Sequence, residues 1–279
     1  MNTAHHVPVA PTISLTPNVI AAWGRVGTPE LLAPGVTRVD GLVFKRASGP
    51  SEWVTWQHRV LARAWDDGVR LQRIVPAIDG RLVVDGWVAQ TFLVGHHRPD
   101  AWDEILAATS AVTASLARVP ASVVLPLPGL RHDAWAAADR MAWNEEVVPT
   151  RLRDPIVDQL LALCRNASSP LHVIHGDMTR NVLFAVGLPP GVIDFSPYRR
   201  PSSYALGVVI ADAVVWHGAP LTIADRVMSV PDDVQGLVRA MLFRHLTALQ
   251  LGRPIPMGDA ADRYAALRET VGFMVDAGG

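Results

Sequence analysis

Hydrophobic and polar residues follow two different periods along this chain of 279 residues. In the first third, apolar and polar positions alternate over short stretches, which is typical of half-buried strands. Val36–Val39 and Leu42–Lys45 are two such stretches, and Asp40-Gly41 between them predicts a tight hairpin. We therefore predict a small antiparallel sheet. The same strand pattern recurs at residues 73–76, 82–84 and 87–93.

One helix is expected within this sheet region. A Ser-Gly-Pro break precedes Ser51, which can cap a helix that continues to about Ala64. Apolar residues at helical spacing, such as Trp53 and Trp56, form its predicted buried face. Glu52 lies in the first turn, where the helix dipole favours an acid.

The apolar spacing becomes helical beyond residues 96–99, His-His-Arg-Pro, which we interpret as a hinge. We predict a two-lobed α+β protein, in which residues 1–94 form the N-terminal sheet lobe and residues 95–279 the larger helical lobe. Asp100 is expected to cap the first helix of the second lobe. Helices are expected at residues 101–119, 133–146, 154–167, 203–216, 232–250 and 259–275.

A stretch without helical spacing interrupts these helices at residues 172–195 and reads HVIHGDMTRNVLFAVGLPPGVIDF. It predicts a strand end, a polar loop, and two strands at Asn181–Ala185 and Gly191–Phe195. Residues 187–190, Gly-Leu-Pro-Pro, are expected to form the turn between these strands. His175 is expected to anchor the loop through a hydrogen bond.

Three polar residues of this stretch lie where apolar strands end: Asp177, Asn181 and Asp194. A rigid scaffold directs such side chains at a ligand from the loops beside it. One carboxylate could act as a base, while Asn181 and Asp194 could provide oxygen ligands for Mg²⁺. Together they indicate a site for phosphoryl transfer.

Composition narrows the class of protein. The net charge of −1 argues against a nucleic acid or an anionic membrane as a partner, because both require clustered cations. We see neither a secretory signal nor a membrane-spanning segment, and we therefore expect a cytoplasmic enzyme. A single cysteine, Cys164, excludes an internal disulfide and a cysteine-rich metal site.

Lys45 is the single lysine among 25 basic residues, and all the others are arginines. Its retention at the end of a sheet strand suggests a site that needs a compact ammonium group. Phosphoryl transfer needs such a lysine to neutralise phosphates, and a helix carboxylate can hold the lysine in place. Glu52 is placed to provide that carboxylate.

The segments IHGDMTRNVLF and GVIDF resemble the catalytic-loop and metal motifs of the aminoglycoside phosphotransferase and choline kinase superfamily. GLVFKR around Lys45 extends the resemblance, which appears closest to actinobacterial members without an assigned substrate. It implies a protein-kinase-like fold and phosphorylation of a small-molecule hydroxyl with ATP and Mg²⁺. Asp177 would be the catalytic base, Asn181 and Asp194 the Mg²⁺ ligands, and Lys45 a phosphate contact.

The sequence departs from this family pattern in two places. Asp177 and Asn181 enclose three residues where the family usually has four, which shortens the loop. The segment expected to cover the nucleotide, Ala33-Pro34-Gly35-Val36, offers one glycine where several are usual, and Gly35 is then the candidate contact. Asp212 could replace the missing acid after the metal motif by bonding the catalytic-loop backbone.

Other interpretations remain open at this point. Asn181 could be a turn residue, and Glu52 could serve the helix dipole alone. A nucleotide- or metabolite-binding pseudokinase is the main alternative to an active enzyme, and a structural protein without a site is a further one. The acceptor, the choice between ATP and GTP, and the oligomeric state do not follow from the sequence. Candidates for acceptor contacts are Trp102, Trp143, Trp216, Asp103, Glu104, Glu145 and Glu146.

Overall fold

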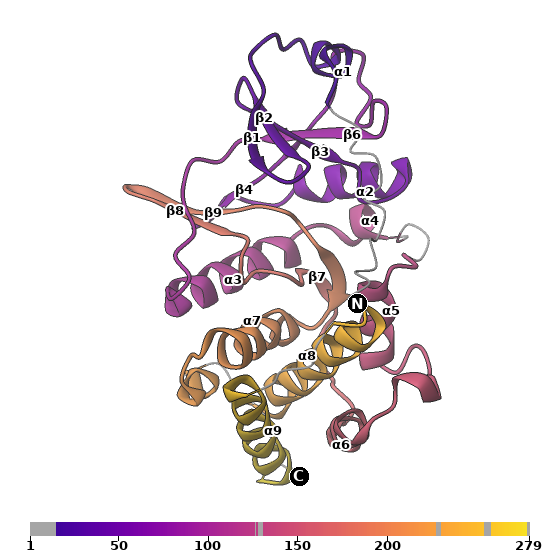
Figure 1. Ribbon diagram of the computed structural model, residues 1–279, viewed down its shortest axis with the longest axis vertical. Helices are drawn as coiled ribbons and strands as arrows, with labels where there is room; N and C mark the ends of the chain where they lie inside the picture. Colours follow the sequence, from indigo (N-terminus) through magenta and orange to yellow (C-terminus); the bar gives the residue numbers. More distant parts are fainter. Residues whose placement is uncertain (1–14, 126, 128–130, 227–229, 254–257, 278–279) are drawn as a thin grey trace, which may run out of the picture. The chain divides into compact units, whose positions relative to one another are not determined.

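The computed structural model describes residues 15–125, 127, 131–226, 230–253 and 258–277. These residues form two compact units (Figure 1). The first unit consists of the chain up to residue 59 together with residues 73–92, and the second of residues 60–72 together with the chain from residue 93 onwards. The assignment of a nucleotide lobe to residues 1–94 and an acceptor lobe to residues 95–279 stays a prediction.

The first unit contains an antiparallel sheet with the strand order β1-β2-β3-β6-β5. The predicted hairpin at Asp40-Gly41 is confirmed, because both residues have positive φ angles, 50° and 79°, as a type I′ turn requires. The strands are β1 (Glu30–Ala33), β2 (Val36–Val39), β3 (Leu42–Arg46), β5 (Ile74–Val75) and β6 (Trp87–Thr91).

Two helices accompany this sheet: α1 (Pro17–Ala22) and α2 (Ser51–Leu61). The core of the unit is built on Phe44, which is fully buried and meets Trp23 edge-on at 5.5 Å between ring centroids. The strand predicted at residues 82–84 is wrong, since only Val84 pairs, as a single bridge to Trp87.

Helices make up most of the second unit. The prediction that Asp100 caps its first helix is wrong, because helix α3 begins at Trp102 and its N-cap position is Ala101. None of the described helices combines the length and apolarity that crossing a bilayer requires. The helices are α3 (Trp102–Ala117), α4 (Ala121–Val124), α5 (Ala134–Ala142), α6 (Pro155–Leu163), α7 (Ser202–His217), α8 (Pro231–Gln250) and α9 (Asp259–Ala277), with 3₁₀ turns η1 (Thr150–Leu152) and η2 (Leu221–Arg226).

Helices α7 and α8 pack together through two glycines (Figure 1). A Cβ atom on Gly207 would lie 2.7 Å from the carbonyl oxygen of Gly236. A Cβ atom on Gly236 would in turn lie 2.7 Å from the carbonyl carbon of Ser203. The absence of both side chains therefore lets the two backbones touch at this crossing.

Two small sheets lie in the same unit. Strand β7 (His172–His175) pairs with β10 (Pro197–Arg200), and β9 (Leu188–Val192) lies between β4 (Arg70–Leu71) and β8 (Val182–Ala185). The predicted four-residue turn is wrong. The turn is at Val186-Gly187, and Pro189 and Pro190 belong to strand β9.

A bulge explains why this strand accepts prolines. Ala185 pairs with Leu188 and Leu183 with Gly191, so β9 uses one residue more than β8 over the same span. A residue at a bulge lacks a regular ladder partner, and a proline, which has no N–H, loses little there.

Candidate active site

The loop between β7 and β8 carries Asp177, the predicted base. His175 fixes its start, with Nε2 lying 3.1 Å from the carbonyl oxygen of Ile193. Because that oxygen can only accept, Nε2 carries the proton, and Nδ1 accepts the backbone N–H of Asp177 at 3.2 Å. Gly176 is required between them, since a Cβ there would overlap the Tyr198 ring. The anchoring role predicted for His175 is confirmed.

Asn181 closes the short loop. Its backbone N–H donates to the carbonyl oxygen of Met178 at 3.0 Å. Its side-chain Nδ2 donates to the carbonyl oxygen of Asp177 at 2.7 Å and lies 3.4 Å from the Oδ2 atom of the same residue. Three intervening residues are therefore enough to bring the amide against Asp177.

Asp194 follows strand β9 and is held next to Asn181. The backbone N–H of Ile193 donates to the carbonyl oxygen of Asn181 at 3.0 Å. Asp194 itself has a φ of +53°, a left-handed conformation that aspartate tolerates better than most residues. Its N–H donates to Oε1 of Gln72 at 3.3 Å, and the residue is exposed.

The chemistry of these donors fits a hard divalent cation. The amide nitrogen of Asn181 makes the contacts to Asp177, and within the described residues its side-chain oxygen accepts no hydrogen bond. Asp194 provides a carboxylate near Asn181, because the residue before it, Ile193, is hydrogen-bonded to the backbone of Asn181. Mg²⁺ is commonly held by one or two protein oxygens together with water and substrate phosphates. No group of three or more His, Cys, Asp or Glu residues suited to a metal occurs in the described part.

Arg244 on helix α8 connects the loop to helix α7 and was not predicted. Its Nε and Nη2 atoms bind both carboxylate oxygens of Asp212, at 2.9 and 2.5 Å. Nη2 also donates to Oδ1 of Asp177 at 2.9 Å. Burial lowers the pKa of Arg244, but the adjacent charges of Asp212 and Asp177 outweigh burial and raise it. Arg244 therefore stays charged at every working pH.

Asp212 completes the network, because its Oδ2 accepts a hydrogen bond from the hydroxyl of Thr179 at 2.8 Å. The contact between Asp212 and the loop is thus present, but it runs through a side chain rather than through the expected backbone group. Asp212 is 9% exposed in its side chain, whereas Asp177 is 47% exposed. The base candidate is therefore the solvent-facing end of this network.

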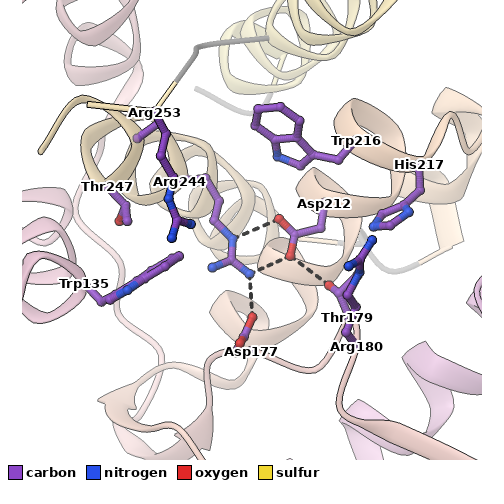
Figure 2. A pocket seen from close by; sticks show the side chains of 11 residues that line it. Trp135, Asp177, Thr179, Arg180, Asp212, Trp216, His217, Arg244, Thr247 and Arg253 are labelled. Atoms are coloured by element: carbon purple, nitrogen blue, oxygen red, sulfur yellow. Dashed lines mark hydrogen bonds and ion pairs between the residues drawn. The ribbon is translucent and has the colours of Figure 1, made fainter. Parts of the chain in front are cut away.

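A pocket of about 490 Å³ opens over these residues (Figure 2). Figure 2 shows Asp177, Arg244 and Asp212 joined across it, with Trp135 and Trp216 on different sides. Its volume suits a ligand of small-molecule size. The lining residues are Trp135, Asp177, Thr179, Arg180, Asp212, Trp216, His217, Arg244, Thr247, Ala248 and Arg253.

Some of these lining residues were predicted from the sequence, and others were not. Trp216 lines the pocket as suggested, but Trp102 and Trp143 do not. The four acids named as possible acceptor contacts are also absent from the lining, and three of them pair with arginines. Glu104 pairs with Arg98, Glu145 with Arg200, and Glu146 with Arg140.

Arg244 and Trp135 carried no signal in the sequence. Each lies on an amphipathic helix without a motif, and only the packing of α5 and α8 brings them to the loop.

The remaining candidates lie in the first unit. Lys45 is half-buried on β3, opposite Val88 of β6, and Gly35 lies in the β1–β2 turn with a φ of +74°. Glu52 is exposed in the first turn of α2. The expected pair between Glu52 and Lys45 stays a prediction. The roles of these three residues stay predictions.

Comparisons with solved structures identify the fold. The aminoglycoside phosphotransferase APH(4)-Ia in complex with ADP and hygromycin B aligns with a TM-score of 0.57 at 14% identity, covering 94% of this chain and 98% of that chain. An aminoglycoside phosphotransferase from Alicyclobacillus acidocaldarius gives 0.55 at 14% identity, covering 98% of both chains. The Plasmodium vivax ethanolamine kinase gives 0.52 at 12% identity, covering 88% and 81%.

These likenesses confirm the predicted α+β kinase-like fold. No curated protein matches the sequence. The sequence does match the family described as "Phosphotransferase enzyme family" over residues 35–200, a span that includes Lys45, the catalytic loop and Asp194. The prediction that the protein is a phosphotransferase is thereby confirmed, and the chain belongs to the phosphotransferase enzyme family.

Proposed function

We propose that the protein transfers a phosphoryl group from ATP to a hydroxyl of a small molecule, with Asp177 as the base. The position of Asp177 supports this proposal most directly. Its carboxylate lies at the pocket wall and is bound by Arg244 through Oδ1. Within the described residues, Oδ2 has only the long 3.4 Å contact to Asn181 and can accept the proton of an acceptor hydroxyl.

The ion pair with Arg244 holds the Asp177 carboxylate in a fixed position. The transition state of phosphoryl transfer is usually loose, so orientation of the hydroxyl matters more than full removal of its proton. Arg244 and Asn181 both restrict the direction of the carboxylate. Asp177 would thus act mainly by aligning the acceptor.

The nucleotide and metal roles are proposed on the chemistry of the residues. Asn181 and Asp194 would hold Mg²⁺, which when bound supplies charge neutralisation at the phosphates. Lys45 and Gly35 would contact the phosphates, with Glu52 nearby in the chain. A cytoplasmic location and closeness to actinobacterial members belong to the same proposal.

The test is an ATP-consumption screen over hydroxylated metabolites and antibiotics. With an accepted substrate, Asp177→Asn should reduce turnover by about 10²- to 10⁴-fold, the usual contribution of a general base, while ADP binding stays unchanged. Asp158→Asn is the matched control, because Asp158 forms an exposed ion pair with Arg153 outside the pocket. Equal loss of turnover and ADP binding in Asp177→Asn would contradict the base assignment.

A pseudokinase is the second candidate, and the bond from Arg244 to Asp177 favours it by occupying one oxygen of the base. In that case ATP binds in the presence of Mg²⁺, but no acceptor raises ADP production above the Asp177→Asn background. Any acceptor that does so excludes this candidate.

A further inference from the structure

The pocket holds more positive than negative charge. Arg180, Arg244 and Arg253 face two carboxylates, Asp177 and Asp212. Both carboxylates already bind Arg244. The charges of Arg180 and Arg253 are therefore not neutralised by the acids that line the pocket.

Arg180 and Arg253 also find no partner elsewhere in the described part. Both residues are exposed, and neither guanidinium forms an ion pair or hydrogen bond with a described residue. The residues outside the described part contain no Asp or Glu. Guanidinium groups bind carboxylates and phosphates through paired N–H donors, so each of these two arginines offers a contact for an anion in the pocket.

Aromatic surface accompanies these charges. The guanidinium carbon of Arg253 lies 5.8 Å from the ring centroid of Trp135, and that of Arg244 lies 5.6 Å from the same ring. Trp216 provides a second indole, which is 45% exposed. Flat apolar walls beside a cation suit a ligand that combines a planar or apolar part with a negative group.

We infer that the acceptor is an anion: a small hydroxylated compound with a planar or apolar body and a carboxylate or similar group. The negative group binds Arg253 beside Trp135, the body packs on Trp135 and Trp216, and the hydroxyl reaches Asp177, while Arg180 adds positive charge from the other side of the pocket (Figure 2). This inference rests on the proposed function. A polycationic amino sugar would meet two uncompensated arginines here and no unpaired carboxylate in the lining.

The experiment compares three para-hydroxymethyl probes of similar size that carry a negative, a neutral or a positive group: the benzoate, the benzamide and the benzylamine. Calorimetry measures their binding with and without ADP. The benzoate should bind about tenfold or more tightly than the other two, as expected for a charge-assisted contact. Raising the salt concentration should weaken the benzoate alone.

Substitutions of Arg253 and Arg180 test which arginine contacts the carboxylate of the benzoate. Arg253→Gln should weaken benzoate binding by about tenfold, Arg180→Gln should weaken it less, and neither should change binding of the benzamide. Arg151→Gln is the control, because Arg151 is exposed in η1 and lies outside the pocket. Tighter binding of the benzylamine, or no benzoate binding at millimolar concentration, would overturn the inference. So would variants that weaken ATP binding instead of benzoate binding.

Asp177→Asn separates the two proposals. It should reduce phosphorylation by the same factor of about 10² to 10⁴ while the benzoate still binds. Benzoate binding together with no turnover of any acceptor in the screen would remove the proposed enzyme activity and leave the anion site. Turnover of neutral or cationic acceptors alone would keep the activity and remove the anion site.

Discussion

Two arginines in the second unit each bridge two acids, and the difference between them separates a structural network from the one that carries the proposed base. Arg244 joins Asp212 to Asp177, and Arg200 joins Asp139 to Glu145. In each network one acid is buried and the other half-exposed. The side chains of Asp212 and Asp139 are 9% and 7% exposed, and those of Asp177 and Glu145 are 47% and 50% exposed.

The two networks differ in how many carboxylate oxygens the arginine binds. Arg200 binds both oxygens of Asp139 and both oxygens of Glu145. Arg244 binds both oxygens of Asp212 but a single oxygen of Asp177. Arg200 thus saturates its acids and fixes the end of β10 to α5. Arg244 holds Asp177 in place through Oδ1 and leaves Oδ2 for the proposed contact with an acceptor hydroxyl.

The largest effect on stability is expected at Arg200. Arg200→Met leaves the buried Asp139 without its partner, and such a loss typically lowers the free energy of unfolding by about 3–5 kcal/mol. Urea unfolding measures this change. ADP binding of the fraction that stays folded should be retained, since Arg200 does not line the pocket. A stable variant with reduced turnover would instead place Arg200 in the functional network.

Arg244→Lys should affect turnover more than stability. Lysine keeps the charge beside Asp212 but cannot bind two acids through a rigid planar group. We expect a loss of stability of about 1–2 kcal/mol, as for a weakened charged hydrogen bond. Turnover should fall on the order of tenfold to a hundredfold, because Asp177 loses its fixed direction. A kcat unchanged by this substitution would show that Arg244 does not position the base.

The smallest effects on stability are expected at the two half-exposed acids, Glu145 and Asp177. Glu145→Gln and Asp177→Asn should each change the free energy of unfolding by less than about 1 kcal/mol, since exposed partners contribute little. Only Asp177→Asn should reduce turnover. If Glu145→Gln reduced it equally, the distinction between the two networks would fail.

Local signals in the sequence were enough for much of the fold. Asp40-Gly41 specified a hairpin because few other residue pairs adopt two positive φ angles. Asp154 and Asp133 cap α6 and α5 close to the predicted helix starts. Pro189-Pro190 misled the prediction because a bulge can place prolines in a strand, and a bulge depends on the partner strand.

The loop that carries Asp177 and Asn181 could be predicted because its residues are adjacent in the sequence. The rest of the pocket could not. Arg244 follows Asp177 by 67 residues, and its contact depends on how α7 and α8 pack. Trp135 reaches the pocket from α5. Neither residue belongs to a repeating pattern that distinguishes a pocket wall from an ordinary helix face.

The glycine crossing of α7 and α8 limits how this pocket could diversify. Asp212 lies five residues beyond Gly207, and Arg244 eight residues beyond Gly236, so the two helices are in backbone contact close to the network. With no side chain between them, they cannot approach further, and any larger residue would separate the acid from its arginine. Under the proposed function, changes in acceptor range would therefore come from other lining residues, such as Trp135, Trp216 and Arg253, while the Asp212–Arg244 pair stays constant.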